Sequence, residues 1–186
     1  MDPCHHGGVN EALENDGDPA WTPVQPGPIG ILSDSHGRAE RTERGIRILE
    51  QAGATSFLHL GDLGSQTVVD QLAGRPVRIV LGNVDPPDLA DYASYLGVVV
   101  DSPTIRLLVG GRRLGATHGH LDAEVRQLSL DRPDYLVHGH THRVRDDRID
   151  GMRILNPGAI DRATRLTVGL LDPARDRFEI LEIPFD

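Results

Sequence analysis

Lysine is absent from this chain, and all nineteen basic residues are arginine. This absence excludes chemistry that needs a lysine amine, such as a P-loop or a Schiff base. A single cysteine, Cys4, excludes an internal disulfide framework and fits a reducing compartment. No apolar run approaches the length of a membrane span, and no basic region precedes an apolar stretch at the N-terminus. We therefore expect a cytoplasmic protein without a membrane partner.

The remaining composition is that of one globular domain with an acidic extension. The 186 residues are 38% hydrophobic and 25% charged, which allows a core that is stable on its own. Residues 1–27 are rich in glycine, proline and acidic side chains and lack apolar periodicity, so we predict a disordered tail before a domain over 28–186. The net charge is −9, and five of these charges come from acidic residues of the predicted tail. The domain that remains is mildly acidic, which disfavours binding to duplex nucleic acid.

Strand-like and helix-like segments alternate from Pro28 onward. Short apolar runs typical of buried strands alternate with amphipathic runs typical of helices over 29–34, 38–53, 56–62, 65–74 and 76–83. This order is the signature of parallel βαβ units. Beyond a linker at 85–103, which could carry a lid, we predict a hairpin turning at Gly110-Gly111, a helix over 123–130 and a strand over 134–140. Antiparallel strands complete an α/β protein of two packed sheets with helices outside.

Potential metal ligands follow several of these predicted strands. They carry carboxylate, amide or imidazole groups and stand beside glycines: Asp34, His36, Asp62, Asn83, His118, His140 and His142. Ligands gather beyond the carboxyl ends of parallel strands, so we expect these side chains to converge. Mixed oxygen and nitrogen donors suit Mn, Fe, Zn, Co or Ni better than Ca or Mg. Seven ligands fit two metals that share a carboxylate, a device for attacking phosphate esters.

Each motif also has a structural alternative. Asp34, Asp62 and Asn83, taken singly, are compatible with turns or caps. Cys4, His5 and His6 could bind a metal, but their place in a predicted tail favours an adventitious cluster. The closely spaced histidines of THGH and HGHTH are instead typical of metal binding, and the joint order of the motifs favours a metal site.

The ordered motifs SDSHG, LGD, LGNVD, THGH, GHTH and NPGA resemble the calcineurin-like metallophosphoesterase superfamily over residues 28–186. The resemblance is to its branch of small single-domain phosphodiesterases. It implies a four-layer αββα sandwich of two mixed sheets flanked by helices. It also implies two metal sites that share Asp62 as a bridging ligand, one formed by Asp34, His36, Asp62 and His142 and the other by Asp62, Asn83, His118 and His140.

The resemblance further implies hydrolysis of small phosphodiesters by a metal-bridging hydroxide, with Mn as the expected metal. A phosphomonoesterase or nucleotidase stays open, because ligand residues do not distinguish monoesters from diesters. A non-catalytic scaffold, like the related retromer subunit, also stays open as a function, although the intact ligand set disfavours it. A polymer nuclease is disfavoured by the mild acidity of the domain and the absence of lysine. The exposed late strands leave a homodimer open.

One position differs from the nuclease and protein-phosphatase branches of the family. Where nucleases and protein phosphatases carry a histidine that assists the leaving group, this chain has Val84. We therefore take His120 as the first candidate for a catalytic acid or phosphate contact and Asp85 as the second. An orienting hydrogen bond is the alternative role for His120. His59 is predicted to be structural, and Arg162 either contacts phosphate or forms a surface ion pair.

Overall fold

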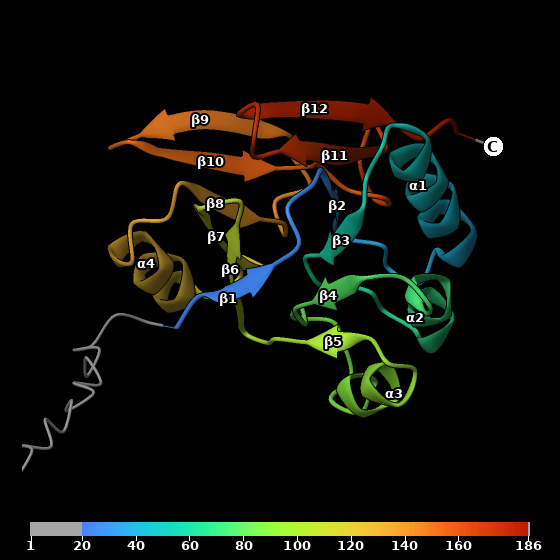
Figure 1. The fold of residues 1–186 in the computed structure, drawn as a ribbon. Helices are drawn as coiled ribbons and strands as arrows, with labels where there is room; N and C mark the ends of the chain where they lie inside the picture. Colours follow the sequence, from blue (N-terminus) through green and yellow to red (C-terminus); the bar gives the residue numbers. More distant parts are fainter. Residues whose placement is uncertain (1–19, 186) are drawn as a thin grey trace, which may run out of the picture.

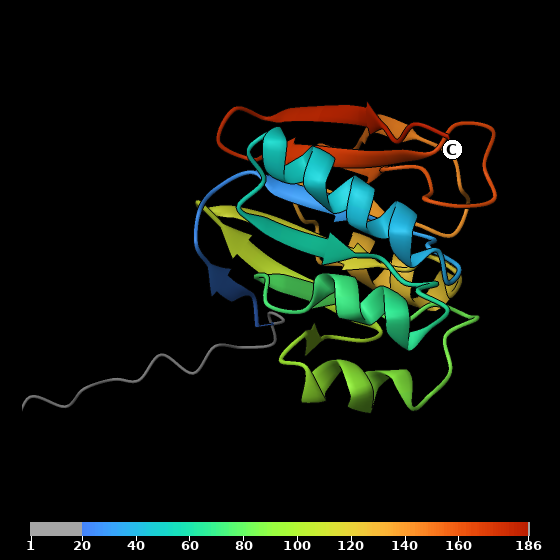
Figure 2. The same cartoon turned by 90° about the vertical axis from the view of Figure 1, so that its right-hand side faces the viewer.

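Two six-stranded sheets pack face to face, with helices on both outer faces (Figures 1 and 2). The computed structural model describes residues 20–185, so the histidines and cysteine of the N-terminal cluster lie outside the described residues. The layers run helix, sheet, sheet, helix, which confirms the predicted αββα sandwich. Within residues 20–185, no helix combines the length and apolar character that crossing a bilayer would require.

The first sheet carries the predicted βαβ units. Its strands, in the order β12-β11-β2-β3-β4-β5, are Arg177–Glu182, Thr167–Asp172, Ile29–Leu32, Ser56–His59, Val77–Ile79 and Val99–Val100. The four strands β2 to β5 run parallel to one another. Three helices cover the outer face of this sheet: α1 (Ala39–Gln51), α2 (Gln66–Leu72) and α3 (Leu89–Tyr95).

The second sheet contains the hairpins. Its strands, in the order β1-β6-β7-β8-β10-β9, are Thr22–Val24, Thr104–Val109, Arg112–Thr117, Tyr135–His138, Met152–Asn156 and Arg145–Ile149. The turn between β6 and β7 contains Gly110 and Gly111 at positive φ, as the predicted hairpin requires. Helix α4 (Asp122–Leu130) covers the outer face through the buried Leu128. β9 is an edge strand, and the homodimer stays a prediction.

Two segments differ from the prediction. Residues 20–27 are not a disordered tail, because β1 pairs with β6 and the guanidinium of Arg113 lies 5.5 Å from the Trp21 ring centroid. Residues 85–103 are not a linker, because they form α3 and β5, and Leu89 and Ala93 are buried. These elements are short and carry little periodicity, so packing against the rest of the fold decides their structure.

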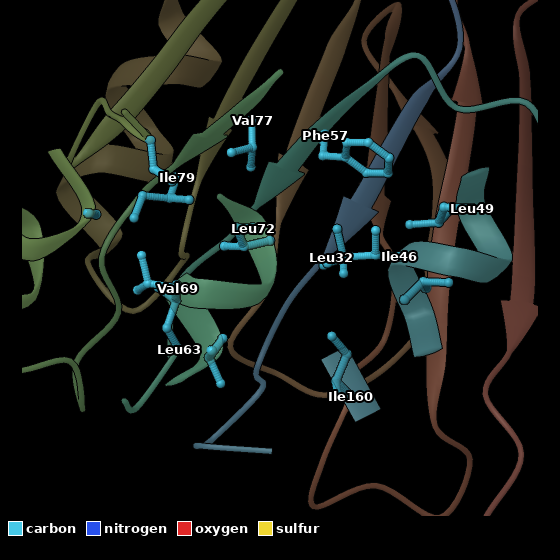
Figure 3. Close-up of a cluster of buried hydrophobic side chains, with 14 of the residues drawn as sticks. Leu32, Ile46, Leu49, Phe57, Leu63, Val69, Leu72, Val77, Ile79 and Ile160 are labelled. Atoms are coloured by element: carbon cyan, nitrogen blue, oxygen red, sulfur yellow. The ribbon is translucent and has the colours of Figure 1, made fainter. Parts of the chain in front are cut away.

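The apolar core has two layers. One lies between the sheets, and the other lies between the first sheet and helices α1 to α3 (Figure 3). Ile46 and Leu49 project from one face of α1 into the second layer, where Figure 3 shows them near Leu32. Burial of each such side chain contributes about 1.5–3 kcal/mol. The resulting frame fixes the strand ends from which the candidate ligands project.

Candidate metal centre

The structure brings all seven predicted ligands together at the carboxyl ends of parallel strands. They follow β2 (Asp34 and His36), β3 (Asp62), β4 (Asn83), β7 (His118) and β8 (His140 and His142). Their ligand atoms form two groups, each with all members within 4.8 Å of one another: Asp34, His36 and His142, and Asp62, His118 and His140. Asn83 joins the second group, since its Oδ1 lies 3.2 Å from Nε2 of His118. Segments that are more than one hundred residues apart therefore form one site.

Five of the seven candidate ligands adopt a left-handed backbone conformation. Their φ angles are 58° for Asp34, 45° for His36, 54° for Asp62, 64° for His140 and 56° for His142. Such conformations cost on the order of 1–3 kcal/mol each and cluster at functional sites. Backbone hydrogen bonds support them: the Asp34 and His36 N–H groups donate to the loop after β3, at 3.1 and 2.9 Å.

Two glycines allow the close approach of these loops. A Cβ on Gly82 would lie 2.0 Å from Oδ1 of Asp62, and a Cβ on Gly139 would lie 1.9 Å from Oγ of Ser33. No side chain fits at either position without displacing its neighbour. The glycines beside the ligand motifs therefore set the spacing between the loops.

Asp34 presents one carboxylate oxygen to the site. Its Oδ2 accepts hydrogen bonds from the Ser33 hydroxyl at 2.6 Å and from the His140 N–H at 3.1 Å. Its Oδ1 is buried, has no hydrogen-bond donor among the described residues and lies 3.2 Å from Nε2 of His142. An unsatisfied buried carboxylate oxygen is costly unless a cation or a donor binds it.

The imidazoles beside Asp34 also present lone pairs. Nδ1 of His142 donates to the carbonyl oxygen of Arg162 at 3.2 Å, so Nε2 of the neutral ring carries no proton. Nε2 of His36 lies 3.3 Å from Nε2 of His142. Burial lowers the pKa of His36, and the charge of Arg162 lowers it further, so the ring is neutral and able to bind metal. These groups fit a divalent cation.

The second group has the same character. Nδ1 of His118 donates to the carbonyl oxygen of Leu60 at 2.6 Å, so its Nε2 is an acceptor in the neutral ring. That nitrogen faces Oδ1 of Asp62 at 3.3 Å and Oδ1 of Asn83 at 3.2 Å. Burial lowers the pKa of His118, but the Asp62 carboxylate outweighs burial and raises it. The position therefore attracts positive charge, whether a proton or a metal ion.

Asp62 lies between the two groups. Its Oδ1 faces His118, and its Oδ2 lies 3.8 Å from Nε2 of His36. Burial alone would raise the pKa of Asp62, but hydrogen bonds from His118 and the Val84 N–H outweigh burial and lower it to about 2. Asp62 is therefore ionised at neutral pH, and this placement suits the bridging role that the family resemblance implies.

His120 lies beside the second group. Its ring centroid is 5.2 Å from that of His118 and 6.2 Å from that of His140. Its Nδ1 is buried without a hydrogen-bond partner among residues 20–185. Burial lowers the pKa of His120, and the neighbouring histidines lower it further. A catalytic or phosphate-contacting role for this ring stays a prediction.

Asp85 braces two loops. Its carboxylate oxygens accept the backbone N–H groups of Gly64 at 2.7 Å and Gly82 at 2.8 Å. Burial raises the pKa of Asp85, although these hydrogen bonds oppose the rise. This geometry favours a positioning role over the predicted general-acid role. The side chain of Val84 is 45% exposed and offers no proton.

Sequence reasoning missed the side chains that hold the ligand loops. Ser33 was not singled out, although it precedes Asp34 in the motif. The amide of Asn156 donates to the carbonyl oxygen of Gly139 at 2.9 Å and so fixes the loop of His140. Asn156 belongs to the NPGA motif, which did not predict this contact. His59 is fully buried against Ser35 at 2.8 Å, and burial lowers its pKa to about 3, which suits the predicted structural role.

Comparisons with known proteins agree with this geometry. The calcineurin-like phosphoesterase superfamily domain matches residues 28–176. The chain is 24% identical over 159 residues to the phosphodiesterase MJ0936 of Methanocaldococcus jannaschii, covering 81% of this chain and 95% of the relative. It is 29% identical over 145 residues to the phosphodiesterase YfcE of Escherichia coli, covering 70% and 77%.

Solved structures share the fold. An archaeal phosphodiesterase superposes with a TM-score of 0.75 at 22% identity, over 83% of this chain and 99% of the other. Zinc-complexed Vps29 from Entamoeba histolytica superposes with a TM-score of 0.58 at 19% identity, over 84% and 99%. At these identities the superpositions establish a common architecture.

Proposed function

Because this chain belongs to the calcineurin-like phosphoesterase superfamily, we propose that it is a metal-dependent phosphodiesterase acting on small phosphodiesters. The observation that carries the proposal is the convergence of carboxylate, amide and imidazole ligand atoms from distant segments of the chain on two adjoining groups. Nε2 of His118 faces two acceptor oxygens, and the buried Oδ1 of Asp34 faces Nε2 of His142. The names of the two phosphodiesterase relatives support the same reaction class.

Divalent transition-metal ions bound at the two groups would supply Lewis acidity and an activated water for hydrolysis. The mixed donor set favours such ions over Ca or Mg, and we propose Mn. Asp62 is ionised and lies between the groups, where it would hold both ions. Ser33 orients the carboxylate of Asp34 through its hydroxyl.

Position 84 holds a valine, so no histidine is present there to assist the leaving group. Nδ1 of His120 has no hydrogen-bond partner among the described residues and lies beside the second group, and we propose that the ring contacts the substrate phosphate. A general acid typically contributes two to four orders of magnitude in rate. We therefore expect modest turnover and a preference for diesters with good leaving groups.

A non-catalytic scaffold is the second candidate, because zinc-complexed Vps29 shares the fold. Metal analysis and hydrolysis together separate the two functions. The purified protein, reloaded with Mn, is expected to hydrolyse bis(p-nitrophenyl) phosphate, and p-nitrophenyl phosphate tests for monoesterase activity. Metal binding without hydrolysis of either ester would favour the scaffold.

His140→Ala tests the site directly. Its side chain belongs to the second ligand group, yet the residue is exposed, so its loss should leave the fold intact. We expect reduced metal content and a loss of activity of at least about a hundredfold. Val144→Ala, an exposed substitution just beyond the same loop, is the matched control. Unchanged activity in His140→Ala would remove this group from the site.

A further inference from the structure

A hollow of about 530 Å³ adjoins the candidate metal centre. It lies between the loop after β8 and the loop between β10 and β11, and its lining residues are His140, Thr141, His142, Arg143, Arg162, Ala163 and Thr164. Two of these are candidate metal ligands, and two are arginines. None of the described residues that line the hollow is acidic. It is therefore a positively charged space that opens directly on the proposed reaction site.

Arg143 has no counter-ion within the described part of the chain. No carboxylate of residues 20–185 lies within 4.0 Å of its guanidinium, and the residue is exposed. Arg145, two positions further on, pairs with Asp147 at 2.7 Å. The guanidinium of Arg143 is therefore free to bind an anion that enters the hollow.

Arg162 stands on a loop that is fixed relative to the ligands. Its carbonyl oxygen accepts a hydrogen bond from His142, and its backbone is left-handed with a φ of 56°. The preceding residue, Asp161, donates its N–H to the carbonyl oxygen of Asp34 at 3.1 Å. Both flanks of Arg162 are thus tied to candidate ligands, which holds its Cα at a set position beside the metal centre.

The charge on Arg162 is only partly compensated. Its Nε lies 4.0 Å from the Asp161 carboxylate, which also pairs with Arg41 at 2.5 Å and Arg38 at 3.5 Å. Three guanidinium groups thus share one carboxylate. Arg143 and Arg162 therefore bring two guanidinium groups to the hollow, of which the first has no carboxylate partner among residues 20–185 and the second shares one with two other arginines. A phosphodiester carries a single negative charge, which would lie at the candidate metal centre, so these two groups would face a further anionic group.

We propose that Arg143 and Arg162 form an anion subsite that holds a second phosphate group of the substrate while the scissile diester lies at the metal centre. The inference rests on the proposed phosphodiesterase function and narrows its substrate class to small diesters that carry an additional phosphate. Guanidinium groups suit this task because their planar forks match phosphate oxygens.

A pair of substrates with the same scissile bond tests the subsite. Thymidine 5′-(p-nitrophenyl phosphate) carries only the diester, and its 3′-phosphorylated form adds one phosphate. Exposed charge pairs contribute a few-fold each, so two arginines should give the Mn-loaded wild type about a tenfold higher kcat/KM for the phosphorylated form. Arg143→Gln, which leaves Arg162 and its contact with His142 in place, should lower this preference to about threefold while kcat/KM for the unphosphorylated diester stays within about twofold. In the double variant Arg143→Gln, Arg162→Gln the preference should disappear.

Arg165→Gln is the matched control, because Arg165 pairs with Glu182 and does not line the hollow. It should keep the preference. The preference should also weaken as salt concentration rises. A wild type that treats the two diesters equally, or a double variant that retains the preference or loses both activities equally, would overturn the subsite.

A binding measurement separates this inference from the proposed function. Calorimetric titration of the Mn-loaded protein compares thymidine 3′,5′-bisphosphate with thymidine 5′-monophosphate, and we expect about tenfold tighter binding of the bisphosphate, lost in the double variant. If the wild type hydrolyses neither diester, the proposed function fails while the titration still decides the subsite. Equal affinities for the two nucleotides would refute the subsite alone.

Discussion

Replacing Gly82 with alanine tests whether the position of Asp62 controls both candidate metal sites. The new Cβ would lie 2.0 Å from Oδ1 of Asp62 and 2.4 Å from its backbone nitrogen. Real Cβ contacts essentially never fall below 3.0 Å, so Asp62 must retreat by about 1.0 Å, the difference between 3.0 and 2.0 Å. Since Asp62 faces His118 through one oxygen and His36 through the other, both groups of ligands are disturbed.

The expected effect is larger on activity than on stability. A misplacement of about 1 Å costs roughly a hundredfold in rate, whereas overpacking costs about 1–3 kcal/mol in the free energy of unfolding. We would measure hydrolysis of bis(p-nitrophenyl) phosphate at saturating Mn, metal content by mass spectrometry and unfolding in urea. The activity is then expressed per folded molecule.

Gly30→Ala is the matched control for overpacking. Its Cβ would meet Cδ1 of Phe57 at 2.7 Å, in the core between the first sheet and its helices. We expect a similar loss of stability with unchanged kcat and metal content. A Gly82→Ala protein with wild-type metal content and kcat within about twofold would refute the reasoning that the approach of this loop sets the position of Asp62.

Three further substitutions test the surroundings of the site and of the fold. Ser33→Ala removes the hydroxyl that donates to Asp34 at 2.6 Å, and we expect equilibrium dialysis to show metal affinity about ten- to a hundredfold lower, with an unchanged circular dichroism spectrum. Asp85→Asn replaces one of two acceptor oxygens with a donor, so the free energy of unfolding should fall by about 1–3 kcal/mol. The basic limb of the pH–rate profile should persist, and its loss would identify Asp85 as a general acid instead. Burial raises the pKa of Asp176, but hydrogen bonds from two arginines and a tyrosine outweigh it and lower the pKa to about 2, so its stabilisation is present above pH 3.8 and lost as the pH falls toward 2. Asp176→Asn should flatten that part of the stability–pH curve, and an unchanged slope would contradict the assignment.

The order of the elements could be predicted from the sequence because the signal is local. Apolar runs and amphipathic segments between residues 29 and 83 predict strands β2 to β4 with helices α1 and α2 between them, and the structure contains all five. Strand β1 and helix α3 escaped prediction for the opposite reason. Each is short, and each is stabilised by partners distant in the sequence, such as β6 for β1.

The candidate ligands could be named from the sequence alone, because polar residues that follow parallel strands lie together at the carboxyl edge of their sheet. The packing of the two sheets brings the ligands that follow β2, β3 and β4 against the ligands that follow β7 and β8, which belong to the other sheet. It also sets which atoms face the site. Nδ1 of His118 donates its proton to the carbonyl oxygen of Leu60, and the carboxylate of Asp85 accepts hydrogen bonds from two backbone N–H groups. Arg143 and Arg162 line the same hollow. These outcomes depend on distances between loops from different strands, and no local pattern of residues encodes such distances.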